Sequence, residues 1–150
     1  MKNLFEAAST AEVKTRLANL RPDSPRIWGK MTSAQAVAHC ASALEVALGD
    51  KTLPPVLVGR ILGRVIKPFV FRNDDPIRRN APTMKSLEVT DQRDLNRERE
   101  RLQALISRFA DAGPQGCTKD AHSFFGQLTP EEWAILMYKD LDHHLRQFGV

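Results

Sequence analysis

The C-terminal segment 129–149 constrains the fold most, because it predicts a helix whose buried side also carries ionisable groups. Thr129 can accept hydrogen bonds as the N-cap, Pro130 fits the first helical turn, and Glu132 completes a capping box. At about 100° per residue, the apolar side chains gather on one side of this helix. They are Trp133, Leu136, Met137, Leu141 and Phe148. This pattern predicts a helix that packs into a core and ends near Gly149.

Asp140 and His144 lie on or beside that apolar side, where an ordinary core helix carries Leu or Ile. Asp142 and Arg146 are expected to point the other way, into solvent. Burying an unpaired carboxylate is costly, so Asp140 needs a partner, and His144 follows one helical turn later. The two side chains can bind one divalent metal ion in common, or they can form a hydrogen-bonded pair without a metal. The helix alone leaves both interpretations open, and a third ligand from elsewhere is needed to decide between them.

A second informative helix is predicted from a capping box at Thr32–Gln35 to a stop at Gly49. Its inner face is rich in alanine, which lets another helix approach closely and leaves room around an imidazole ring. His39 lies on the flank of this face, where it is either a core histidine bonded to a backbone carbonyl or a ligand. Cys40 lies about 100° further round the helix and is expected to be a buried, unreactive thiol.

Two more helices are expected, one from a capping box at Ser9–Glu12 to Leu20 and one over residues 92–112. Thr90 or Asp91 can cap the latter. Four amphipathic helices predict an all-α fold, a four-helix bundle that forms one domain over residues 1–150.

Residues 50–90 separate the second and third of these helices and predict a long, irregular crossing. Within it, Val56–Ile66 reads as a short helix ended by Pro68, and Gly59 and Gly63 suggest a close contact with another helix. Residues 69–71 are expected in a loop. The arginines that follow are expected to be solvated, although they could serve an anionic ligand. They are Arg72, Arg78 and Arg79.

Composition narrows the class of protein. The 150 residues are 42% apolar and 27% charged, as in globular chains. No apolar run reaches the ~18 residues of a membrane span, and no secretory signal is evident. Cys40 and Cys117 form no CxxC motif, so we expect a reducing, cytoplasmic location. The net charge of +4 is spread out, which argues against a nucleic-acid binder. We expect a small-molecule substrate and no membrane partner.

Several motifs occur in an order that resembles a known superfamily. Trp28–Thr32 precedes the helix with His39, the loop His122–Thr129 precedes Glu132-Trp133, and Leu141–Gly149 ends the chain. The whole pattern resembles the DinB/YfiT-like metalloenzymes, and within them a subgroup of small bacterial proteins of unknown function. The resemblance extends over nearly the whole chain, and its terminal motif is the most specific part.

The resemblance implies a four-helix bundle in which three histidines hold a divalent metal ion. One comes from the second helix, which maps to His39, and two with H-x-x-x-H spacing come from the last helix. The last of these maps to His144, whereas the middle one falls on Asp140, where the superfamily usually has histidine. Either Asp140 is a ligand, giving a site with two histidines and one carboxylate, or the site is weakened. His143 is expected at the rim or as a hydrogen-bond donor that supports a ligand, and Gln147 is expected to orient a ligand or a water molecule.

The resemblance also implies an activity. Relatives include thiol-dependent S-transferases and an isomerase that uses a low-molecular-weight thiol. We therefore expect a metal-dependent enzyme, a transferase or hydrolase, with Zn, Ni, Fe or Mn as the ion and a low-molecular-weight thiol as a candidate cofactor. The sequence identifies no catalytic residue beyond the metal ligands. The alternative is a non-catalytic binding or stress-response module with a degenerate site, and a homodimer is compatible with either.

Overall fold

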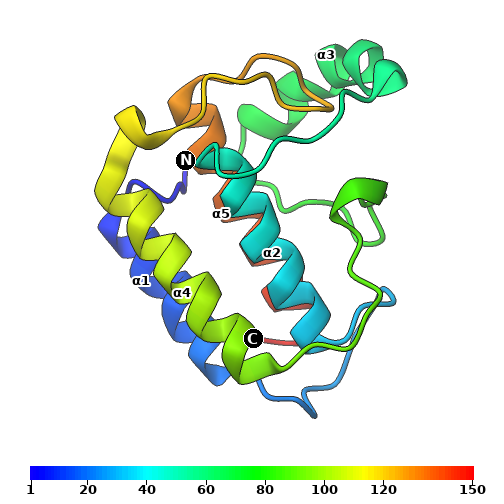
Figure 1. The fold of residues 1–150 in the computed structure, drawn as a ribbon, viewed down its shortest axis with the longest axis vertical. Helices are drawn as coiled ribbons and strands as arrows, with labels where there is room; N and C mark the ends of the chain where they lie inside the picture. Colours follow the sequence, from blue (N-terminus) through cyan, green and yellow to red (C-terminus); the bar gives the residue numbers. More distant parts are fainter.

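A computed structural model describes all residues from 1 to 150, and they form an all-helical fold with five α-helices (Figure 1). The α-helices are α1 (Ala7–Asn19), α2 (Ser33–Ala47), α3 (Leu57–Phe71), α4 (Leu95–Ala112) and α5 (Pro130–Gln147). Two short 3₁₀ helices are η1 (Lys85–Leu87) and η2 (Gly113–Gly116). None of the helices combines the length and the apolar character needed to cross a bilayer.

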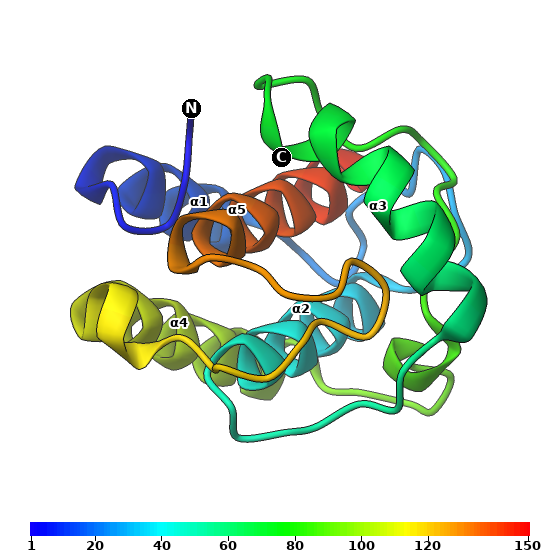
Figure 2. The same cartoon turned by 90° about the horizontal axis from the view of Figure 1, so that it is seen from above.

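Helices α1, α2, α4 and α5 enclose the core. α2 packs against α4 and α5, and α1 packs against the same two helices (Figures 1 and 2). Each of the four contributes to one cluster of buried apolar side chains. Its fully buried members include Leu17 of α1, Leu44 of α2, Phe109 of α4 and Trp133 of α5. The core therefore lies where the periodicity of the sequence places it.

The two capping boxes that frame the candidate site are confirmed. In α2 the Thr32 side chain accepts from the Gln35 amide and the Gln35 side chain accepts from the Thr32 amide. Thr129 and Glu132 make the same reciprocal pair at the start of α5. These boxes satisfy backbone donors that a helix start otherwise leaves without partners.

The predicted caps of the other two core helices are wrong. α1 begins at Ala7, so that Ser9 and Thr10 lie inside the helix, and the Thr10 hydroxyl donates to the carbonyl of Leu4. α4 begins at Leu95 rather than near residue 92, because the Asp94 side chain accepts the Arg97 amide as N-cap. At α4 an alternative N-cap replaces the predicted one, whereas α1 begins without a side-chain cap.

The crossing between α2 and α4 is less irregular than predicted, because it contains α3. α3 continues to Phe71, so Pro68 does not end it and residues 69–71 are helical. Among the other helices α3 contacts only α5, and Figures 1 and 2 show it at one edge of the molecule. Gly59 and Gly63 make the expected close contact, but with Phe124 in the loop before α5 rather than with a helix.

Candidate metal centre

The packing of α2 on α5 brings His39, Asp140 and His144 together. Nε2 of His39 lies 3.5 Å from Oδ1 of Asp140, and Nε2 of His144 lies 3.8 Å from the same oxygen. One ligand atom from each residue lies within 4.8 Å of the other two. Residues 101 positions apart in the chain therefore meet at one point, as the resemblance to the DinB/YfiT-like metalloenzymes implies.

His39 is held in one orientation by a backbone carbonyl. Its side chain is buried, and Nδ1 lies 2.9 Å from the carbonyl oxygen of Leu87, the last residue of η1. A carbonyl only accepts, so Nδ1 carries a hydrogen and donates it. The opposite nitrogen, Nε2, then presents its lone pair toward Asp140 whenever the ring is neutral.

His144 is fixed by a similar device that runs through Gln147. Nε2 of Gln147 donates to the carbonyl of Trp28 at 2.7 Å, which turns Oε1 of Gln147 toward Nδ1 of His144 at 3.0 Å. Nδ1 of His144 therefore donates, and its Nε2 faces Asp140. Gln147, expected to orient a ligand or a water molecule, contacts the imidazole itself.

The arrangement places three hydrogen-bond acceptors around one point. The lone pairs of two neutral imidazoles and a carboxylate oxygen repel one another unless a cation or a proton lies between them. Both nitrogen–oxygen distances exceed the ~2.9 Å that is usual for a direct hydrogen bond. Two atoms that bind one ion at about 2.0–2.2 Å lie roughly 3–3.5 Å apart, so the donor set fits a divalent metal ion.

The protonation of these residues follows from burial and from their charges. Burial alone raises the pKa of Asp140, but His39, with smaller effects of His144 and His143, outweighs it and holds the pKa well below its ordinary value. Burial lowers the pKa of His39, yet Asp140 and the Leu87 carbonyl outweigh burial and raise it. For His144 burial dominates, and its pKa falls to about 4. Without a metal ion, Asp140 is ionised and His39 is the ring that takes up a proton.

His143 does not belong to this cluster. It is buried rather than at the rim, and its Nδ1 lies 3.2 Å from the carbonyl oxygen of Ile77. Its ring packs edge-on against the rings of His144 and Trp28, with centroids 5.0 and 5.7 Å away. His143 therefore supports the ring of His144 from the side and ties the chain after α3 to α5.

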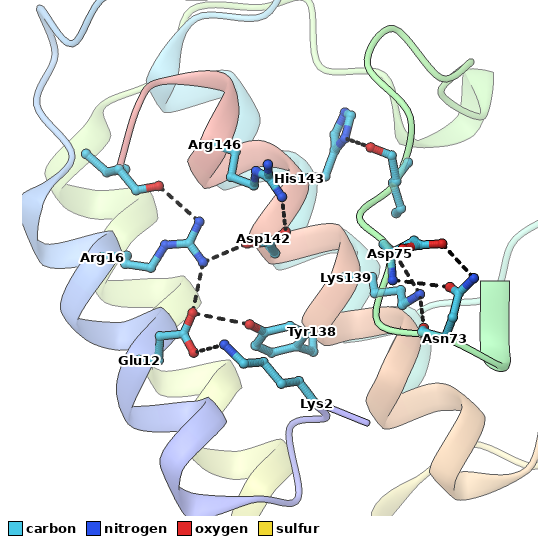
Figure 3. A network of polar contacts seen from close by, with 12 residues as sticks. Lys2, Glu12, Arg16, Asn73, Asp75, Tyr138, Lys139, Asp142, His143 and Arg146 are labelled. Atoms are coloured by element: carbon cyan, nitrogen blue, oxygen red, sulfur yellow. Dashed lines mark hydrogen bonds and ion pairs between the residues drawn. The ribbon is translucent and has the colours of Figure 1, made fainter.

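α5 is fastened on two sides, as Figure 3 shows. On one side the ammonium of Lys139 donates to the carbonyls of Val70, Asn73 and Asp75 at 2.7–2.9 Å. On the other side Asp142 accepts from Arg16 of α1 at 2.8 Å, so its predicted exposure to solvent is wrong. These contacts fix α5 between the crossing and α1, and so fix Asp140 and His144.

Two other residues singled out in the sequence lie outside the cluster. Cys40 is buried, and burial, together with Asp140, raises the pKa of its thiol well above the ordinary value. His122 accepts the amides of Phe124 and Phe125 with Nδ1, and burial lowers its pKa to about 4. Cys40 is thus an unreactive thiol, and His122 is a neutral side chain that shapes the loop under α3.

The residues missing from the sequence prediction are those that contribute only backbone. The carbonyls of Leu87 and Ile77 hold the rings of His39 and His143, and the carbonyl of Trp28 holds the Gln147 amide that orients His144. No side-chain pattern signals such contacts, although Gly29 offers a hint. Its φ is +79°, and a Cβ there would meet Nε2 of Gln147.

Comparison with known proteins identifies a family. Residues 3–149 match the model of a family described as a protein of unknown function, DUF1569. No curated protein matches the chain. No solved structure matches it either.

Proposed function

The chain belongs to the DUF1569 family, whose function is unknown, and we propose that its function depends on a divalent metal ion held by His39, Asp140 and His144. The observation that supports this most is the orientation of both imidazoles. Each has its Nδ1–H bonded to an oxygen that is not itself a ligand, Leu87 O or Gln147 Oε1. Such bonds are typical of metal-binding histidines, because they fix the tautomer and aim the other nitrogen.

For the fold, we propose a four-helix bundle of the DinB type that forms one domain, with Asp140 in place of a histidine. The pairwise packing of α1, α2, α4 and α5 supports it, as does the position of the three residues on α2 and α5. A set of two histidines and one carboxylate leaves further positions on an ion open to a substrate. Zn, Ni, Fe and Mn all suit these ligands.

The activity we propose is that of a metal-dependent enzyme, a thiol-dependent transferase in the first instance, with a small-molecule substrate. A divalent ion in this site supplies Lewis acidity, which lowers the pKa of a thiol or water that it binds. The residues of the chain hold the ion and orient its ligands. Leu87 and Gln147 hold the hydrogens on Nδ1, so that Nε2 of each neutral ring faces the ion, and Asp140, 20% exposed at its side chain, is where solvent reaches the cluster.

The test is the metal content of protein purified without a polyhistidine tag. Asp140→Ala should lower the metal-to-protein ratio sharply, whereas Asp140→His, which restores the three histidines of the superfamily, should keep it. Asp142→Ala is the matched control, because Asp142 lies on the same helix and pairs with Arg16 instead. An unchanged ratio in Asp140→Ala would contradict the proposal.

A second candidate is a non-catalytic module in which His39 and Asp140 form an ion pair without a metal. The raised pKa of His39 beside an ionised Asp140 favours it. The two candidates differ in their response to a chelator. A metal ion whose free concentration is about 100 times its Kd stabilises the folded state by about 2.7 kcal/mol. A melting temperature that no chelator or metal changes would favour the ion pair.

A further inference from the structure

The outer side of α3 is an apolar surface that nothing in the chain covers. Leu57, Ile61 and Phe69 are 76%, 74% and 74% exposed, and Val58 and Val65 are 67% and 64% exposed. At about 100° per residue these side chains share one side of the helix. We call them the apolar face of α3. Single exposed apolar residues are ordinary, but a continuous set of this size on one helix marks a binding surface.

The apolar face points outward because the opposite side of α3 is fitted to the protein. Gly59 and Gly63 lie against Phe124, and a Cβ at Gly63 would collide with the Phe124 carbonyl oxygen. The Val56 amide donates to Ser123 at the start of the helix, and Lys67 pairs with Glu132 of α5 at 2.9 Å. α3 is therefore docked through its glycines, and the outward orientation of its apolar side is built in.

The charges on α3 itself have one sign, and the nearest acidic residues in the chain, Asp74 and Asp75, follow its end. From residue 51 to residue 73 the chain has five basic residues and no acidic one. Lys67 is engaged with Glu132, whereas Arg60 and Arg64 are exposed and make no ion pair. At about 100° per residue, these two arginines line one margin of the apolar face, between it and the glycine side. An apolar side with a cationic margin is typical of helices that lie flat at a membrane surface.

We propose that α3 docks the protein onto an anionic phospholipid surface. The apolar face enters the boundary between headgroups and acyl chains, and Arg60 and Arg64 contact the phosphates. The helix lies in the surface and does not cross it, since 15 residues span about 22 Å and the apolar core of a bilayer is ~30 Å thick. The sequence predicts no membrane partner because no apolar run is long enough to span a bilayer, and a helix that lies flat does not need such a run.

A second copy of the chain fits this surface less well. Two α3 helices packed face to face would bury each other's apolar sides, but α3 carries no acidic residue to pair with Arg60 and Arg64 of the other copy. An anionic lipid surface supplies negative charge to both arginines at once. Each arginine near such a surface raises the partition coefficient about tenfold or less. The proposal does not depend on the metal centre, so either can fail without the other.

The experiment is co-sedimentation of the full chain with vesicles. Vesicles of phosphatidylcholine alone are compared with vesicles that also contain phosphatidylglycerol. We expect binding to the anionic vesicles that weakens with added salt. Ile61→Glu with Val65→Glu should abolish it, and both positions are exposed enough that circular dichroism should be unchanged. Arg60→Gln with Arg64→Gln should weaken binding about tenfold or more.

The control removes the same two charges elsewhere. Arg21 and Arg97 are exposed and lie outside α3, so Arg21→Gln with Arg97→Gln should bind like the unaltered chain. Absence of binding to anionic vesicles, or binding that the α3 variants leave intact, would overturn the proposal. So would a dimer in analytical ultracentrifugation that Ile61→Glu with Val65→Glu dissociates, if vesicle binding is absent.

Discussion

α5 and α3 are both amphipathic helices, but they place their polar and apolar groups in opposite ways. α5 buries Lys139, His143, His144 and Gln147, and each of them has a hydrogen-bond partner in the chain. α3 instead exposes its large apolar side chains and buries only its two glycines. Both helices depart from the usual sorting of residues between core and surface, and such departures are expected where a protein does its work.

The difference separates two kinds of site. Buried polar groups are tolerated on α5 because carbonyls and carboxylates from other segments satisfy them, which also fixes their orientation. The exposed apolar groups of α3 find no such partner within the chain, so their burial requires something outside it. This difference supports the two proposals, a small ion beside α5 and an extended surface against α3.

The largest expected effect is at Lys139, whose ammonium is buried and donates to three carbonyls. Lys139→Met keeps the length of the side chain but leaves those carbonyls without a donor. We expect a loss of about 3 kcal/mol in the free energy of unfolding, because one hydrogen bond to a charged group is worth roughly 1.5–3 kcal/mol and the cost of burying the ammonium offsets part of the other two. Urea denaturation measures it. A loss below about 0.5 kcal/mol, the range of ordinary surface substitutions, would show that the buried contacts of Lys139 do not stabilise the fold.

His122 should make stability depend on pH. Its pKa is about 4 in the folded state and about 6.5 when unfolded. Between these values the unfolded chain binds the extra proton, so stability falls as pH drops from about 6.5 to 4, by up to about 3 kcal/mol. His122→Asn keeps an acceptor for the Phe124 and Phe125 amides but does not titrate. The free energy of unfolding of this variant should change less between about pH 6.5 and 4 than that of the unaltered chain. Parallel pH curves for the variant and the unaltered chain would contradict the prediction.

Gln147 should control metal affinity without being a ligand. Gln147→Leu removes the acceptor of the His144 Nδ1–H, so the ring can move its hydrogen to Nε2 and donate to Asp140 instead. Loss of such a supporting hydrogen bond weakens metal binding by about 10–100-fold. Isothermal titration with Zn²⁺ measures this, with Gln103→Leu on α4 as the same substitution far from the cluster. Equal affinities in the two variants would show that Gln147 plays no part.

Replacement of Gly63 by alanine should weaken the docking of α3, although alanine usually stabilises a helix relative to glycine. An exposed Gly→Ala change in a helix gains up to ~1 kcal/mol. Here the added Cβ meets the backbone oxygen of Phe124, which cannot move like a flexible side chain. We expect Gly63→Ala to weaken the docking of α3 by about 1–2 kcal/mol, measured by hydrogen exchange of its amides. Val58→Ala, on the exposed side, is the control, and a slower exchange in Gly63→Ala would contradict the account.

The sequence predicts the site better than its surroundings. Helical periodicity and two capping boxes single out His39, Asp140 and His144 as candidates, and the resemblance to the DinB/YfiT-like metalloenzymes is what groups them. The carbonyls of Leu87 and Trp28 cannot be found in this way, since any residue supplies one. The pairing of Asp142 with Arg16 joins residues 126 positions apart, and no local pattern announces it.

For α3 the sequence predicts a helix but not which of its sides faces the protein. Its apolar residues have helical spacing, but that spacing alone predicts burial and does not say which side of the helix faces the protein. Pro68 also suggests an end that the helix does not have, because the last turn continues to Phe71. The glycine contacts with Phe124 decide the orientation, and they appear only in three dimensions.

The central claim is that Nε2 of both His39 and His144 is directed at one ion beside Asp140. Two-dimensional ¹⁵N–¹H NMR of the four histidine rings tests it directly, in chelator-treated protein at neutral pH to which Zn²⁺ is added. The Nε2 resonances of His39 and His144 should shift together at one equivalent, while those of His122 and His143 stay in place. Four unchanged rings, or a shift of His143 in place of His39, would contradict the claim.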